Sequence, residues 1–321
     1  MRALRFSLVL AAVSAVCLIA GLMIGSVSLR PAEVVAALFK HESSLAYDIV
    51  WQLRLPRVLT AFACGGLLAL AGVLLQVLLR NPLADPYILG VSGGAAVAAL
   101  GAMLIGIGLP GVNFAAMVGA LATIALVFTL SYRSGEWSMF RLLLTGVVLS
   151  AGFGAVISVI LVVAPSGELR GMLFWLMGDL SHAQGEGWPW VLLLCAAVPA
   201  IVSAPSLDVL TTGEMQARAL GVPVRALQVG IYVLASLATA SAVMLGGAIG
   251  FVGLIVPHVL RLLGVLDHRT LLPAAVVLGG SFVVLADSAA RSVVAPQQLP
   301  VGALTALLGV PLLLLLLSRR R

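Results

Sequence analysis

Charged residues are scarce in this chain. Asp, Glu, Lys and Arg make up 9% of its 321 residues, whereas a soluble domain carries about 25%. Hydrophobic residues make up 62%, and the mean hydropathy is +1.18. Because so few charges cannot cover a folded chain with a water-facing surface, the composition excludes an ordinary soluble domain and indicates a membrane protein.

Lysine is nearly absent: Lys40 is the single one, against 17 arginines. A nucleotide-binding P-loop needs the pattern GxxxxGK[ST], and Lys40 lies in LFKHE with no glycine before it. Any ATP that drives this protein must therefore be bound by another subunit. The arginines stand singly between apolar runs rather than on one basic face, so we expect no nucleic-acid binding.

Residues that carry chemistry are also few. The three cysteines lie in apolar runs without a CxxC or Cys/His cluster, so no metal site is expected. Asp287, near the outer end of its predicted helix, is the only candidate for a buried acid in the spans. Ion-coupled transporters usually hold ionisable groups or broken helices at mid-membrane, so the sequence argues against one, although glycine breaks leave that alternative open. An intramembrane enzyme is a second alternative, and no catalytic motif supports it.

Long uncharged intervals predict the membrane spans, since a helix needs about 20 apolar residues to cross the hydrocarbon core. The intervals are 6–29, 58–79, 86–132, 142–167, 187–207, 226–260, 270–286 and 292–318. The third is long enough for two helices, with a break at 106–113. We expect 226–260 to break at Gly246-Gly247, with a second helix from about 250 to 266. The prediction is all-α, with ten helices in one transmembrane domain, 1–321.

The arginines predict the orientation. With ten spans both termini share a side, and placing them in the cytoplasm puts twelve basic residues inside and six outside, as the positive-inside rule requires. The expected location is the inner (plasma) membrane. The first apolar run resembles a signal peptide, but the spans that follow favour an uncleaved helix.

Three polar segments carry more residues than a plain helix connection needs. Arg54 and Arg57 stand at the outer mouth of the second span, where exposed arginines would meet lipid phosphates or a partner's carboxylates. The inner segment 80–86 contains two prolines and predicts a stiff turn. The inner segment 208–225 predicts a short amphipathic helix that ends at Gly221, with Glu214 and Arg218 paired at i,i+4 spacing. That helix would contact a soluble partner or lie on the lipid surface.

The order of several motifs resembles the FecCD/BtuC-type permease family of ABC importers. These motifs are LRLPR at 53–57, RNPLADPYILGVSGGA at 80–95, ARALGV at 217–222, GFVGLIVPHVLR at 250–261, DHR at 267–269, AD-x-x-AR at 286–291 and LPVG at 299–302. The resemblance covers most of the chain and implies the type II ABC importer fold. It also implies a homodimer with its pathway on the two-fold axis. Partners would be two copies of an ATPase that uses ATP and Mg, and a periplasmic substrate-binding protein.

The resemblance also implies roles for individual residues. Arg54, Arg57 and Arg291 would receive acidic residues of the binding protein. Asn81 and Leu83 would narrow the cytoplasmic exit. The segment 209–221 would couple to the ATPase, with the family motif contributing Ala219, Leu220 and Gly221 beside Glu214 and Arg218.

Two stretches depart from the family pattern. Met139 and Phe140 stand at a second narrow point of the gate, where the family often has small polar residues. Five residues, Leu-Leu-Gly-Val-Leu, separate Arg261 from Asp267, where the family usually has a glycine and then Asp-His-Arg at closer spacing. The cargo implied by the resemblance is an iron(III)-siderophore or related metal chelate, with cobalamin (vitamin B12) and haem as alternatives.

Overall fold

The computed structural model describes residues 2–39, 44–133, 136–137, 139–183 and 187–318. Lys40, His41 and the C-terminal arginines 319–321 lie outside these ranges. The structure is helical apart from one short antiparallel hairpin, β1 (Tyr132–Arg133) and β2 (Glu136–Trp137), in which Tyr132 is opposite Trp137. The helices in chain order are α1 (Arg2–Met23), α2 (Pro31–Phe39), α3 (Leu45–Asp48), the π-helix η1 (Ile49–Arg54), α4 (Leu55–Leu78), the 3₁₀ helix η2 (Pro86–Leu89), α5 (Val91–Leu104), α6 (Leu109–Ser131), α7 (Met139–Val163), α8 (Ser166–Leu176), α9 (Trp188–Val202), α10 (Ala204–Thr211), α11 (Glu214–Ala219), α12 (Val224–Gly246), α13 (Val252–Leu262), α14 (His268–Ser292) and α15 (Val301–Ser318).

Six of the described helices are long and apolar enough to cross a membrane. A seventh candidate is the pair α9 and α10, which bend by 57° at Ser203. Three shorter apolar helices, Val91–Leu104, Val252–Leu262 and Val301–Leu315, complete the set. These segments correspond to the ten predicted ones and confirm the all-α membrane fold, although three of them are shorter than a full span.

The two predicted breaks in the long intervals are confirmed. The chain turns between α5 and α6 with Gly106 at φ 73°, a left-handed conformation that glycine adopts without steric cost. The second break follows Gly246, where Gly247 has φ 67° and Phe251 has φ 69°. The helix after this break, α13, ends at Leu262 rather than near 266, because the chain turns at Gly264 with φ 85°.

Helix α4 forms the centre of the bundle. All of its residues are buried except Leu55 and Leu59, and it packs against α9, α12, α13 and α14. A helix that is apolar all round is stable only when other helices or lipid surround it. In contrast, α7 is poorly covered in the single chain, and only 6% of its apolar window is buried.

Glycines set the closest helix contacts. A Cβ on Gly72 of α4 would lie 1.9 Å from the Gly253 carbonyl oxygen of α13, and one on Gly65 would lie 2.2 Å from the Gly279 oxygen of α14. Only hydrogen at these positions allows the backbones to approach so closely, which is how small residues strengthen helix packing in lipid. Gly94 of α5 likewise packs against Gly119 and Thr123 of α6.

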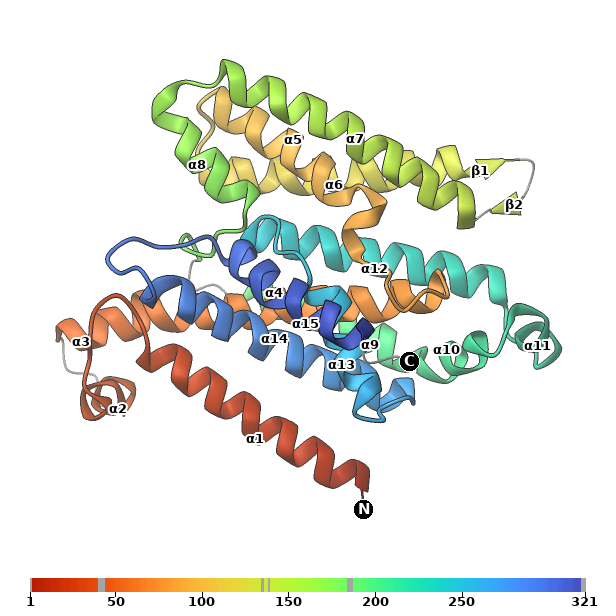
Figure 1. The fold of residues 1–321 in the computed structure, drawn as a ribbon, viewed down its shortest axis with the longest axis horizontal. Helices are drawn as coiled ribbons and strands as arrows, with labels where there is room; N and C mark the ends of the chain where they lie inside the picture. The colour runs from red at the N-terminus through yellow and green to blue at the C-terminus, as the bar shows by residue number, and fades with distance from the viewer. Residues whose placement is uncertain (1, 40–43, 134–135, 138, 184–186, 319–321) are drawn as a thin grey trace.

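The two ends of the bundle carry different short elements (Figure 1). Helices α10 and α11 and the start of α14 lie at one end, together with the N-terminus of α1. Helices α2, α3 and α8 and the end of α14 lie at the opposite end. The end with α10 and α11 is the one that the arginine distribution predicts to face the cytoplasm, and it is called the inner end below.

Candidate functional site

Three buried arginines and one carboxylate form a polar network at the outer end of the bundle. Asp287 of α14 is 1% exposed and pairs with two of the arginines. Arg57 Nη2 lies 2.8 Å from Asp287 Oδ1, and Arg291 Nε lies 3.0 Å from Oδ2. The carboxylate therefore joins the start of α4 to the last turns of α14.

The network extends to α1 and to the segment before α15. Arg54 donates to the carbonyls of Leu22, Met23 and Val27, and so holds the chain that follows α1. Arg291 Nη2 donates to the Gly21 carbonyl at 3.2 Å. Arg57 Nη1 donates to Gln298 Oε1 at 3.0 Å. These bonds satisfy guanidinium groups that would be costly to bury without acceptors.

The sequence predicts that these arginines are exposed, and the structure corrects this. Arg54, Arg57 and Arg291 are 3%, 8% and 5% exposed, because their partners come from α1, α14 and the segment before α15. Their spacing in the sequence gives no sign of these distant partners. Docking of a binding protein on these arginines stays a prediction. It requires either that their intramolecular bonds open, or that the buried arginines act indirectly by holding the shape of the surface above them.

The inner segment 208–225 forms two short helices instead of the single helix predicted. Gly213 has φ 128° and separates α10 from α11. Helix α11 ends at Ala219, and Gly221 stops it as predicted: Gly221 N donates to the Arg218 carbonyl and Val222 N to the Ala217 carbonyl, the bonds of a Schellman motif. Ala217 faces the core, whereas Arg218, Ala219, Leu220 and Gly221 are exposed.

Glu214, the first residue of α11, connects this segment to the predicted gate turn. Its pairing with Arg218 is present at 3.5 Å, and Arg80 Nη2 lies closer, at 3.1 Å from Glu214 Oε1. Gln228 of α12 also donates to Glu214 Oε1, at 3.0 Å. The predicted coupling and gate segments are therefore in direct contact.

The segment 80–86 is a tight turn, as predicted. Asn81 Oδ1 accepts a hydrogen bond from Leu83 N at 2.9 Å, and the Asn81 carbonyl accepts from Ala84 N at 3.0 Å. Leu83 is 38% exposed. Among the other predicted gate residues, Met139 is the first residue of α7 and is half-buried, and Phe140 is exposed.

A second contact joins the coupling segment to α14. Asp208 of α10 accepts hydrogen bonds from the backbone N–H of His268, at 3.1 Å, and from its Nδ1. The His268 ring is buried. The carboxylate therefore lies at the N-terminus of α14, where unpaired backbone N–H groups favour a negative charge.

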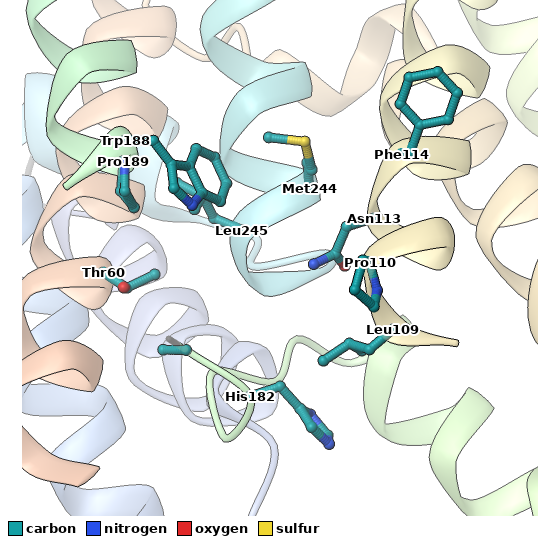
Figure 2. Close-up of a pocket in the computed structure, with 11 residues that line it drawn as sticks. Thr60, Leu109, Pro110, Asn113, Phe114, His182, Trp188, Pro189, Met244 and Leu245 are labelled. Atoms are coloured by element: carbon teal, nitrogen blue, oxygen red, sulfur yellow. The ribbon is translucent and has the colours of Figure 1, made fainter. Parts of the chain in front are cut away.

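A cavity of about 380 Å³ opens between α4, α6, α9 and α12 (Figure 2). Its wall is mostly apolar, with Trp188 and Met244 facing the space, and Asn113 and His182 add polar groups. Thr60, which also lines it, is one turn along α4 from Arg57, so the cavity lies toward the outer end. Its volume is at the low end for a drug-sized ligand, and none of the predicted site residues lines it.

Several residues in these contacts were not predicted from the sequence. Arg80, Asp208, His268 and Gln298 appear only once the helices are packed. The i,i+4 spacing of Asp287 and Arg291 is the one local signal that would have indicated part of the outer network. Among the described residues, no group of three or more His, Cys, Asp or Glu is arranged to hold a metal ion.

The fold and the apolar helices define a multi-pass membrane transport protein, and known proteins specify the family. A model of the FecCD transport family matches residues 12–319, so the chain belongs to the FecCD transport family. It is a permease subunit of an ABC importer and not itself catalytic, which sets aside the ion-coupled transporter and the intramembrane enzyme.

Three relatives match this chain over most of the length of both proteins. An uncharacterised ABC transporter permease protein of Bacillus subtilis (strain 168), YvrB, is 39% identical over 95% of this chain and 91% of its own. The hemin transport system permease protein HmuU of Yersinia pestis is 38% identical over 85% of each chain. The vitamin B12 import system permease protein BtuC of Salmonella arizonae (strain ATCC BAA-731 / CDC346-86 / RSK2980) is 39% identical over 86% of this chain and 85% of its own.

A solved structure has the same fold. It is described as an inward-facing conformation of an ABC transporter assigned to the metal-chelate type, and it superposes with a TM-score of 0.87 at 32% identity. The match covers 98% of this chain and 99% of the other.

Proposed function

We propose that this permease imports an iron(III)-siderophore or a related metal chelate across the inner membrane, with haem and cobalamin as alternatives. Membership of the FecCD family carries the proposal, and relatives of similar identity are named for hemin and for vitamin B12. The single permease domain, 1–321, would form a homodimer with both termini in the cytoplasm.

The exposed apolar helices support a homodimer. Helix α7 leaves most of its apolar side chains uncovered, and α15 exposes Leu307, Leu308 and Leu314. Lipid and a second copy of the chain would share these surfaces. A pathway between two copies would also leave room for a cargo larger than the cavity within one subunit.

Two ATPase subunits would bind at the inner end and supply all ATP and Mg chemistry. Met215 of α11 and Leu220 directly after it are 85% and 70% exposed, and they give this segment an apolar surface that suits insertion into a partner's cleft. A surface helix bound to lipid would usually be more basic. A periplasmic binding protein would dock at the outer end, whose shape Arg54, Arg57 and Arg291 maintain from beneath.

Uptake by cells tests the proposal. Cells that lack their own importers would express this chain with a matching ATPase and binding protein, and would receive a ⁵⁵Fe-siderophore, haemin or cyanocobalamin. We expect uptake of one of these that is lost when the ATPase carries an inactivating Walker-A substitution. Uptake that survives this substitution, or no uptake of any of the three, would overturn the proposal.

A further inference from the structure

Glu214 connects the two inner segments that the proposed function uses. Its carboxylate receives Arg80 at 3.1 Å, Gln228 at 3.0 Å and Arg218 at 3.5 Å. The Arg80 and Glu214 side chains are 46% and 39% exposed, so their pair contributes little to stability because water screens it. The pair is placed to link two segments, since it joins α11 to the turn after α4.

The turn that Arg80 begins is bonded within itself. Asn81 accepts from the N–H groups of both Leu83 and Ala84, so residues 81–84 are expected to move together. Arg80 has φ 48°, a left-handed conformation that is uncommon for a residue with a Cβ. This conformation closes the end of α4, since Arg80 N donates to the Val77 carbonyl and Asn81 N to the Gln76 carbonyl, the bonds of a Schellman motif.

The other side of the turn is fixed to the membrane helices. The buried Gln76 side chain of α4 donates to the Ala84 carbonyl at 3.5 Å and to the Gly253 carbonyl of α13 at 3.4 Å. Its Oε1 accepts from Arg261, also of α13. A displacement of α11 would therefore pull the turn at Arg80, and the turn would pivot about its bond to Gln76 at the Ala84 carbonyl.

We propose that Arg80 and Glu214 are positioning residues that transmit movement of α11 to the exit turn carrying Asn81 and Leu83. The proposal rests on the proposed function, in which α11 is moved by the ATPase and the turn narrows the exit. Two segments are coupled energetically only when a contact biases both, and this ion pair is such a contact.

Labelling of a cysteine in the turn tests the proposal without knowledge of the cargo. The reporter protein carries Leu83→Cys and Cys195→Ser, since Cys195 is exposed while Cys17 and Cys64 are buried. The assembled transporter is labelled with a membrane-impermeant maleimide, with and without ATP plus vanadate. We expect ATP plus vanadate to change the labelling rate at position 83. Arg80→Gln or Glu214→Gln should shrink that change by about fivefold or more, the usual lower range of an allosteric coupling.

Three further variants separate transmission from a structural role. The double variant should lose no more response than either single one, because both remove the same bond. Arg80→Lys should restore much of the response. Arg269→Gln, which removes an exposed charge at the same end of the bundle but in neither segment, should leave it unchanged. A reporter that does not respond to nucleotide, a full response in both single variants, or additive losses in the double variant would overturn the proposal. Failure of the proposed function would appear separately, as absent uptake by the unmodified transporter.

Discussion

Arg57 and Asp287 form an ion pair of 2.8 Å although 230 residues separate them in the chain. Asp287 also accepts from Arg291, so one carboxylate serves two buried guanidinium groups that join α4 and α14. Removing one partner of a buried pair is costly, because the remaining charge loses its counter-charge and cannot reach water.

Asp287→Asn should therefore destabilise the protein by about 3–5 kcal/mol, while it keeps the shape of the side chain. Thermal unfolding in detergent, followed by circular dichroism, measures the effect. Asp48→Asn is the control, since Asp48 is exposed at the same end of the bundle and pairs with Gln52. Equal melting temperatures for the two variants would contradict the structural role of Asp287.

The contact between α4 and α13 should tolerate no side chain at Gly72. A methyl group there meets the Gly253 carbonyl oxygen at 1.9 Å, so Gly72→Ala should cost about 1–3 kcal/mol or more through forced separation of the helices. Gly101→Ala in α5 is the matched control, because nothing lies within 4 Å of its added methyl group. It should gain about 0.5–1 kcal/mol from helix propensity. Yield and melting temperature of the purified variants check both, and a harmless Gly72→Ala would refute the close contact.

The bond between α10 and α14 should depend on the oxygen of Asp208. Asp208→Ala leaves the His268 N–H and ring without their acceptor, at a cost of about 1 kcal/mol for this partly exposed group. Amide hydrogen exchange at the start of α14 should quicken. Asp208→Asn keeps an acceptor oxygen and should exchange nearly as the native chain does. If the alanine variant shows native exchange rates, Asp208 does not hold the end of α14.

Asp85, in the turn between α4 and η2, should make stability depend on pH. Burial raises the pKa of its carboxyl group, and the hydrogen bond from Tyr87 N–H at 2.8 Å opposes this more weakly. A carboxyl whose pKa is higher in the folded than in the unfolded chain binds its proton more tightly when folded, so its contribution to stability grows as pH falls through the raised pKa. As the pH falls from neutral toward the ordinary range of a carboxyl group, the native melting temperature should rise relative to that of Asp85→Asn. A constant difference would contradict the raised pKa.

The purified chain should hydrolyse no ATP, because it has no lysine within a glycine-rich phosphate loop. Release of phosphate from ATP, measured on the chain free of its partners, checks this. Hydrolysis should appear once the ATPase subunit is added. Turnover by the chain alone, after mass spectrometry has shown that no ATPase co-purifies, would overturn the assignment as a non-catalytic subunit.

The positions of the helices were largely predictable from the sequence. Charged residues at the ends of apolar intervals mark where a helix must leave the hydrocarbon, and the glycines at 106 and 246–247 mark turns, so both breaks were predicted correctly. The stop at Gly221 was predictable for the same reason, since it depends on residues within one turn of helix. The additional break at Gly213 was missed, because a glycine inside a short polar segment gives no clear signal.

Composition, hydrophobic intervals and local glycine signals thus determined the class of this protein, the number of its apolar segments and most of their breaks. The tertiary structure decided what the charged residues do. Arg54, Arg57 and Arg291 read as exposed docking residues in the sequence, yet they are buried against α1, Asp287 and Gln298. The sequence predicted only that Arg80 begins a stiff turn, whereas the structure shows that it forms an ion pair with Glu214 of the coupling segment. A helix boundary depends on neighbours a few residues away, whereas the partner of a charge depends on how distant helices pack, and that information is not local in the sequence.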